Sequence, residues 1–142
     1  MKINCLTVIL FGVSLIFISC SKSKGEGEAE VRAVINEMRD ELIEYEKNMT
    51  RAANAQEVAN EIRRHSRKMV KFANALKMLG EKYPDLNNEK YTKSRINDAL
   101  IEEVNSNVDP VLDKYGGEPE IAGVYAEILK EMQQTDPTVS DE

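Results

Sequence analysis

One histidine is the residue of this sequence best suited to binding a metal or a haem iron. His65 is the single histidine of the chain, and imidazole is a common ligand of zinc and of haem iron. The spacing of the apolar residues places it on a helix face between Ile62 and Met69. Two interpretations follow: a ligand for haem or metal, or a histidine at the edge of the core whose ring packs while one nitrogen meets water.

The second interpretation is favoured by the surroundings of the histidine. A haem iron would need a second ligand, and Met38, Met49 or Met69 is the nearest candidate. In four-helix cytochromes the two ligands lie near opposite ends of the chain, whereas His65 lies in its middle and is surrounded by arginine and lysine. We therefore expect no bound cofactor.

Other metal sites lack the residue spacing that they require. A carboxylate-bridged two-metal site uses Glu-x-x-His pairs, in which the two residues are three positions apart. The nearest match is Glu61 with His65, which are four positions apart, and it occurs once. Methionine sulfur is a ligand for copper, but no two methionines form an M-x-x-M or M-x-M pair. Core packing is the role that we expect for the methionines.

A basic run without an acidic residue is the most unusual charged feature. Six Lys or Arg residues and no Asp or Glu lie between Ile62 and Gly80. One helical face combines four of them: Arg64, Arg67, Lys68 and Lys71. This face can contact anionic envelope material, where each basic residue contributes about 1 kcal/mol. The alternative, which we favour, is pairing inside the fold with the acidic residues of the preceding helix: Glu37, Asp40, Glu41, Glu44 and Glu46.

The sequence contains no recognisable set of catalytic groups. It has no Gly-x-Ser-x-Gly and no phosphate-binding loop, and its single histidine leaves no plausible Ser/His/Asp set. Paired carboxylates such as Glu102 and Glu103 stand on a helix face that we expect to be solvated. The net charge of −6 argues against a nucleic-acid binder. We expect a protein that is not an enzyme.

The elements that position these residues are helices, because apolar residues recur in steps of three and four. The pattern predicts helices over 31–49, 55–83, 96–115 and 119–134. Asn54 and Glu57 form a capping box at the second start, and Pro84 ends that helix. Pro110 predicts a kink or a break with Asp109 as a new cap, and Gly116-Gly117 ends the third helix.

Short connections between these helices favour antiparallel neighbours. The expected fold is all-α, an antiparallel helical bundle of three long helices and one shorter helix. A long helical hairpin that completes its core as a homodimer is the alternative, since the apolar positions of the first two helices are nearly heptad-regular, as in a coiled coil.

The first 19 residues have the plan of a secretory signal peptide. Lys2 is followed by an apolar stretch over 3–18. Residues 16–20 read Ile-Phe-Ile-Ser-Cys and resemble the lipobox of bacterial lipoproteins, in which cysteine follows a small residue; Phe17 stands where leucine is usual. The resemblance implies cleavage before Cys20 and acyl chains such as palmitate on that cysteine. An uncleaved membrane-spanning helix is the alternative, although a span needs about 20 apolar residues.

This interpretation divides the chain into four parts. The signal peptide covers 1–19, the lipidated cysteine and a flexible polar tether cover 20–28, the helical domain covers 29–134, and an acidic disordered tail covers 135–142. Cys5 leaves with the signal, so Cys20 is the one cysteine of the mature chain. The serine that follows Cys20 favours the outer membrane if the host is Gram-negative, by the same resemblance.

Three segments of the domain are similar to segments of small, uncharacterised helical envelope proteins. They are Asn-Ala-Gln-Glu-Val-Ala at 54–59, Lys-Tyr-Pro-Asp at 82–85 and Lys-Tyr-Gly-Gly-Glu-Pro-Glu at 114–120. This resemblance implies helix boundaries but no activity. We expect a lipid-anchored interaction or structural module of the cell envelope. Its partners would be the membrane through Cys20, another envelope protein or an anionic polymer, or a second copy. The alternative is a small-ligand, haem or metal carrier.

Overall fold

The computed structural model describes residues 24–86 and 88–135, and this part of the chain is helical without a strand. Its helices are α2 (Lys24–Arg51), α3 (Ala55–Lys82), α4 (Asn88–Arg95), α5 (Asp98–Tyr115) and α6 (Pro119–Thr135). The prediction of an all-α fold is confirmed. The signal segment 1–19, Cys20 and the tail from 136 onward lie outside the described residues.

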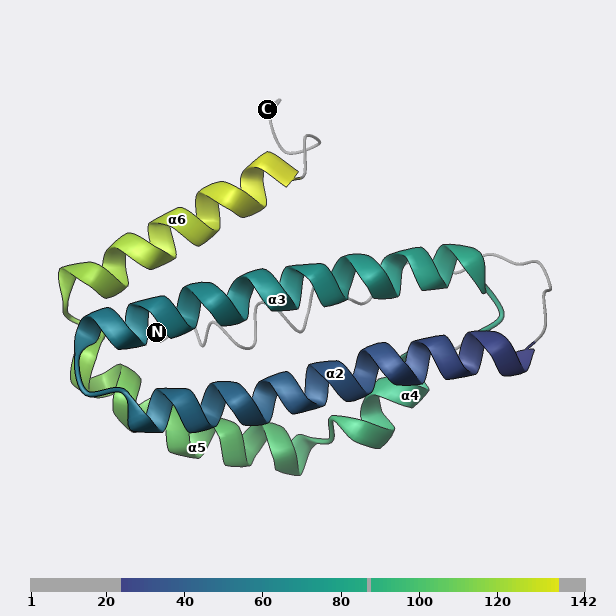
Figure 1. Cartoon of the computed structure of the whole chain (residues 1–142), viewed down its shortest axis with the longest axis horizontal. Helices are drawn as coiled ribbons and strands as arrows, with labels where there is room; N and C mark the ends of the chain where they lie inside the picture. Colours follow the sequence, from purple (N-terminus) through teal and green to yellow (C-terminus); the bar gives the residue numbers. More distant parts are fainter. Residues whose placement is uncertain (1–23, 87, 136–142) are drawn as a thin grey trace.

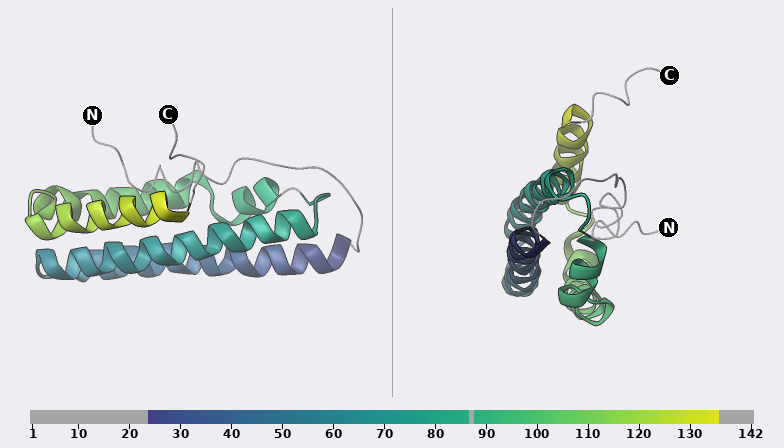
Figure 2. Two further views of the ribbon diagram at one scale, coloured as in Figure 1. Left: turned by 90° about the horizontal axis from the view of Figure 1, so that it is seen from above. Right: turned by 90° about the vertical axis from the view of Figure 1, so that its right-hand side faces the viewer.

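A long antiparallel hairpin of α2 and α3 forms the centre of the molecule (Figure 1). α4 and α5 follow one another along α2, and α6 runs along α3. Viewed from its end, the hairpin carries α6 at one extreme and the α4–α5 pair at the other (Figure 2). Both α2 and α3 therefore have neighbours on two sides, which buries the side chains on the hairpin.

The core consists of the apolar residues that the sequence pattern singled out. Fully buried members include Ile35, Leu42, Met49, Val58, Leu76, Val104, Ile121 and Val124. The pattern separates the faces of α6 less well, because Ile128 is buried whereas Leu129 is 60% exposed. An apolar side chain on a helix of the outer layer does not by itself show which face packs.

The turn between α2 and α3 is held by the predicted capping box. The Asn54 side chain accepts a hydrogen bond from the Glu57 amide at 3.0 Å. Glu57 reaches back and accepts from the Ala53 amide at 2.8 Å. The first bond satisfies an amide that the first turn of α3 leaves without a helical partner, and the second satisfies the amide just before the N-cap residue. The Tyr115 hydroxyl donates to the Ala53 carbonyl at 2.9 Å, so the end of α5 is tied to the same turn.

Of the kink or break predicted at Pro110, the break is wrong, whereas the helix ends predicted at Pro84 and at Gly116-Gly117 are confirmed. α5 continues through Pro110, and the chain instead breaks before Asn97, whose side chain accepts from the Leu100 amide at 2.9 Å. Asparagine offers the backbone this alternative to a helical bond. Pro110 is tolerated because it is exposed, as is Ser106, whose carbonyl would have accepted from position 110. α5 therefore corresponds to the predicted third helix, and α4, which precedes it, had not been predicted.

The start of the first helix also differs from the prediction. α2 begins at Lys24 and includes residues 24–28, which the sequence pattern assigns to the tether. Gly27 explains the difference, since it is buried and its missing side chain lets Tyr83 and Leu86 pack against its backbone. A Cβ at this position would lie 2.6 Å from Leu86 Cδ1 and 2.7 Å from Tyr83 Cγ.

Replacing Gly27 with alanine should lower the free energy of unfolding by about 1–3 kcal/mol, because the added methyl group displaces the Tyr83 ring. Gly123→Ala is the matched control: it also lies within a helix, but nothing stands within 4 Å of an added Cβ. This control should gain up to about 1 kcal/mol from helix propensity. Urea denaturation measures both variants, and equal stabilities would contradict the contact.

Candidate functional site

A buried carboxylate and a buried imidazole meet halfway along the hairpin. Glu41 of α2 and His65 of α3 are each 3% exposed. His65 Nδ1 lies 3.2 Å from Glu41 Oε1. A charged glutamate is rarely buried to this extent unless it has partners. This pair is therefore the first place to look for function within the described residues.

Glu41 gathers three donors from a single helix, α3. Besides His65, Arg64 Nη1 donates to its Oε2 at 2.9 Å, and Lys68 Nζ donates to the same oxygen at 2.5 Å. Burial raises the pKa of Glu41, but the hydrogen bonds from His65, Lys68 and Arg64 outweigh it and hold this pKa at about 2. Glu41 is thus ionised at neutral pH and acts only as an acceptor.

Arg64 joins this carboxylate to a second one on its own helix. Its Nε donates to Glu61 Oε2 at 2.9 Å, and its Nη2 contacts both Glu61 and Glu41. The hydrogen bond with Glu61 is the main reason why the pKa of Arg64 is raised, with Glu41 adding to it. Bidentate pairing of this kind fixes the orientation of the guanidinium group. Arg64 therefore has little freedom to reach outward.

The state of the His65 ring follows from its neighbour. Because Glu41 is ionised, Nδ1 carries the proton that is shared with it. Tyr45 stacks on the ring, with centroids 4.1 Å apart and planes inclined by 20°. Nε2 is the one buried side-chain nitrogen or oxygen in the described residues without a hydrogen-bond partner. The expectation that one ring nitrogen meets water is wrong, because Tyr45 and α2 cover the ring.

Arg67 of the basic face, together with the neighbouring Arg63, pairs with α6 rather than with α2. Arg63 Nε donates to Glu127 Oε2 at 2.9 Å, and Arg67 Nη2 donates to Glu127 and Glu131, both at 2.8 Å. These partners had not been expected. The sequence does hold the signal, since Arg63 and Arg67 on one helix and Glu127 and Glu131 on the other are both spaced by four residues.

The four predicted surface residues thus have different surroundings. Arg64 and Lys68 contact acidic residues of α2, which is the pairing that the internal alternative predicts. Arg67 contacts acidic residues of α6. Lys71 is exposed and has no carboxylate partner among the described residues. Of this basic face, Lys71 is the residue left to act on something outside the fold.

Neither a metal-binding cluster nor a membrane-spanning helix is found in the described part of the chain. In residues 24–86 and 88–135, no three His, Cys, Asp or Glu side chains gather in a way that would hold a metal ion. None of the described helices is both long and apolar enough to cross a membrane. No protein-family model, curated protein or solved structure matches this chain.

Replacing Glu41 with glutamine should destabilise the fold at neutral pH and reduce its sensitivity to acid. The folded-state pKa of Glu41 lies below its ordinary value of 4.5, at about 2. The resulting stabilisation, roughly 3 kcal/mol, is complete above pH 4.5 and is lost as the pH falls toward 2. Urea denaturation between pH 7 and pH 2 measures both effects.

Glu37→Gln is the control, since Glu37 lies on the exposed face of the same helix. It should change the stability at pH 7 by no more than about 0.5 kcal/mol. If Glu41→Gln behaved like this control at every pH, the buried carboxylate would not be what holds α2 to α3.

Proposed function

We propose that the protein is a lipid-anchored, non-enzymatic helical module of the cell envelope that acts through structure or interaction. The observation that carries this proposal is the lipobox-like sequence ending at Cys20, only four residues before α2 begins. Two or three acyl chains on that cysteine would suffice for stable anchoring, whereas one chain binds only marginally. In a Gram-negative host, the location would be the outer membrane.

The module itself is proposed to be an antiparallel bundle in which α4 and α5 together form the third arm. Support comes from the contacts of α2 with α3, α4 and α5 and of α3 with α6. The ion pairs described above support a structural role for most of the charges on α3. An anionic envelope surface would then be contacted chiefly through Lys71.

The anchor predicts a specific change at the amino terminus. In membranes of a bacterial host, the purified protein should begin at Cys20 and carry the mass of two or three acyl chains. Cys20→Ser should abolish both the acylation and the cleavage, whereas Cys5→Ser should leave them unchanged because Cys5 lies within the removed signal. Mass spectrometry of the intact protein and cell fractionation measure this. An unmodified Cys20 in the wild type would refute the proposal.

A ligand carrier is the second candidate, and the buried His65 Nε2, which has no hydrogen-bond partner among the described residues, is the observation that favours it. A histidine that donates from one ring nitrogen to a carboxylate commonly uses the other to bind a metal, since the carboxylate fixes the ring and increases its basicity. The Glu41–His65 pair has this arrangement. Met38 and Met69 are also buried in the core and would supply sulfur.

Titration with haem or with a divalent metal distinguishes the two candidates. A carrier should bind haem with a stoichiometric Soret band that His65→Ala abolishes, and Met78→Ala, an exposed methionine, should leave that band unchanged. A protein that leaves the absorption spectrum of haem unchanged and takes up no zinc or copper would exclude the carrier. The anchored module would be unaffected by that result, because its test is the mass of Cys20.

A further inference from the structure

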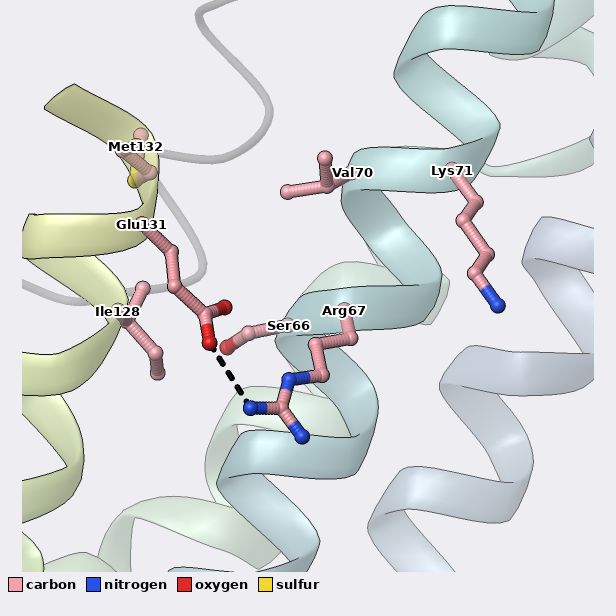
Figure 3. A pocket seen from close by; sticks show the side chains of 7 residues that line it. All are labelled: Ser66, Arg67, Val70, Lys71, Ile128, Glu131 and Met132. Carbon is pink, nitrogen blue, oxygen red and sulfur yellow. Dashed lines mark hydrogen bonds and ion pairs between the residues drawn. The ribbon is translucent and has the colours of Figure 1, made fainter. Parts of the chain in front are cut away.

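The basic face of α3 is largely occupied by contacts inside the fold. Figure 3 shows a cavity of about 260 Å³ between α3 and α6, whose wall is mostly apolar. At this cavity Arg67 is paired with Glu131, and the Lys71 side chain is directed toward α2. Arg64 and Lys68 contact acidic residues of α2. The basic face therefore does not present a continuous positive surface to a partner.

The short helix α4 does present a positive surface. Three of its eight residues are basic, Lys90, Lys93 and Arg95, and one is acidic, Glu89, so its net charge is +2. All four side chains are exposed. Lys93 pairs with Glu89 at 2.6 Å, but a pair as exposed as this one contributes little to stability. Arg95 has no carboxylate partner among the described residues. An anionic partner can therefore reach these basic groups.

The position of α4 is close to the end of the molecule that the anchor would hold. The Tyr91 hydroxyl of α4 bonds to Glu28 of α2, and the Arg32 guanidinium lies 5.3 Å from the Tyr91 ring centroid. Arg32 is eight residues from the start of α2, which is about 12 Å along the helix. The four residues from Cys20 to Lys24 span at most about 14 Å. The anchor would therefore keep α4 within about 26 Å of the membrane along the hairpin.

The next helix, α5, has the opposite charge and leads away from this end (Figure 1). It contains five acidic residues and one basic residue, a net charge of −4. The acidic residues, all exposed, are Asp98, Glu102, Glu103, Asp109 and Asp113. An anionic bilayer attracts α4 and repels α5, with a force that decays over a Debye length of about 8 Å at physiological salt. The charges therefore favour an orientation in which α4 faces the bilayer and α5 points away from it.

We propose that α4 is a docking surface for the anionic phospholipid headgroups of the membrane that holds Cys20. Lys90, Lys93 and Arg95 bond to the headgroup phosphates, and the hairpin stands on the bilayer by its α4 end. Lysine and arginine both form charge-assisted hydrogen bonds with phosphate. This inference rests on the proposed anchor, which brings α4 to the surface. It adds an orientation, because acyl chains on Cys20 alone leave the domain free to turn.

A fluorescent probe on a single thiol measures this orientation. In the acylated protein Cys20 carries a thioether and Cys5 has been removed, so bimane labels only a thiol that is introduced at Ser94→Cys on α4 or Ser106→Cys on α5. The two serines are matched, since each is exposed and donates to the carbonyl three residues before it. The acylated protein is placed on phosphatidylcholine vesicles with or without phosphatidylglycerol, which contain a lipid with a nitroxide quencher in its headgroup.

On vesicles with phosphatidylglycerol, the probe at position 94 should be quenched at least about threefold more than the probe at position 106, because only the first lies within a Debye length of the headgroups. At about 1 M salt this length falls to about 3 Å, so the difference should disappear while the acyl chains keep the protein on the vesicles. Equal quenching at both positions of acylated protein would overturn the inference. Protein that lacks the acyl mass and does not float with the vesicles would refute the anchor, and the inference with it.

Charge variants then assign the contact to α4. Lys93→Gln with Arg95→Gln leaves α4 with no net charge, so quenching at position 94 should fall to the level on phosphatidylcholine alone. Lys47→Gln with Arg51→Gln is the matched control, because it removes two exposed basic residues at the other end of α2, and it should leave the quenching unchanged. If the α4 variant kept the full quenching, its basic residues would serve another partner, such as an acidic protein, and the lipid contact would be refuted.

Discussion

The burial of the Glu41 carboxylate is the constraint on which the rest of the structure depends. An isolated buried charge costs several kcal/mol. The neighbouring helix α3 must therefore place hydrogen-bond donors beside Glu41. Arg64 and His65 do so from one turn of α3, and Lys68 does so from the next turn. Aliphatic side chains tolerate small shifts of one helix along another, but these three contacts do not. The register of α2 against α3, and with it the positions of α5 and α6, is therefore set by one acidic residue.

Much of the helical structure could be predicted because its causes are local. Steps of three and four between apolar residues identify a helix face, and Asn54, Pro84 and Pro119 act on the backbone within a turn of their own position. These features need no knowledge of neighbouring helices. The break at Asn97 illustrates the limit. Both Asn97 and Pro110 can interrupt a helix. Asn97 does so because its side chain caps the Leu100 amide, whereas at Pro110 the exposed Ser106 carbonyl can be left to water.

The features that escaped prediction depend on contacts between distant segments. Glu41 was expected to pair with the basic face but not to be buried; its position directly before Leu42 of the apolar face is the sequence signal, and Glu61 stands likewise before Ile62. The pairing of Arg67 with Glu131 could not be foreseen because the place of α6 was unknown. The cavity beside them arises from how α6 leans on α3, which no spacing of residues within one helix encodes.

The early start of α2 would limit how far the protein reaches from the proposed anchor at Cys20. With Cys20 held in a bilayer, the four residues to Lys24 span at most about 14 Å. The 28 residues of α2 add about 42 Å. Tyr83 and Leu86 pack against the backbone of Gly27. The segment between Cys20 and the helical domain therefore cannot become longer unless that end of the hairpin unpacks. If Cys20 is lipidated as proposed, the protein would sample a shallow layer above the membrane, and any partner would have to come into that layer or be anchored there itself.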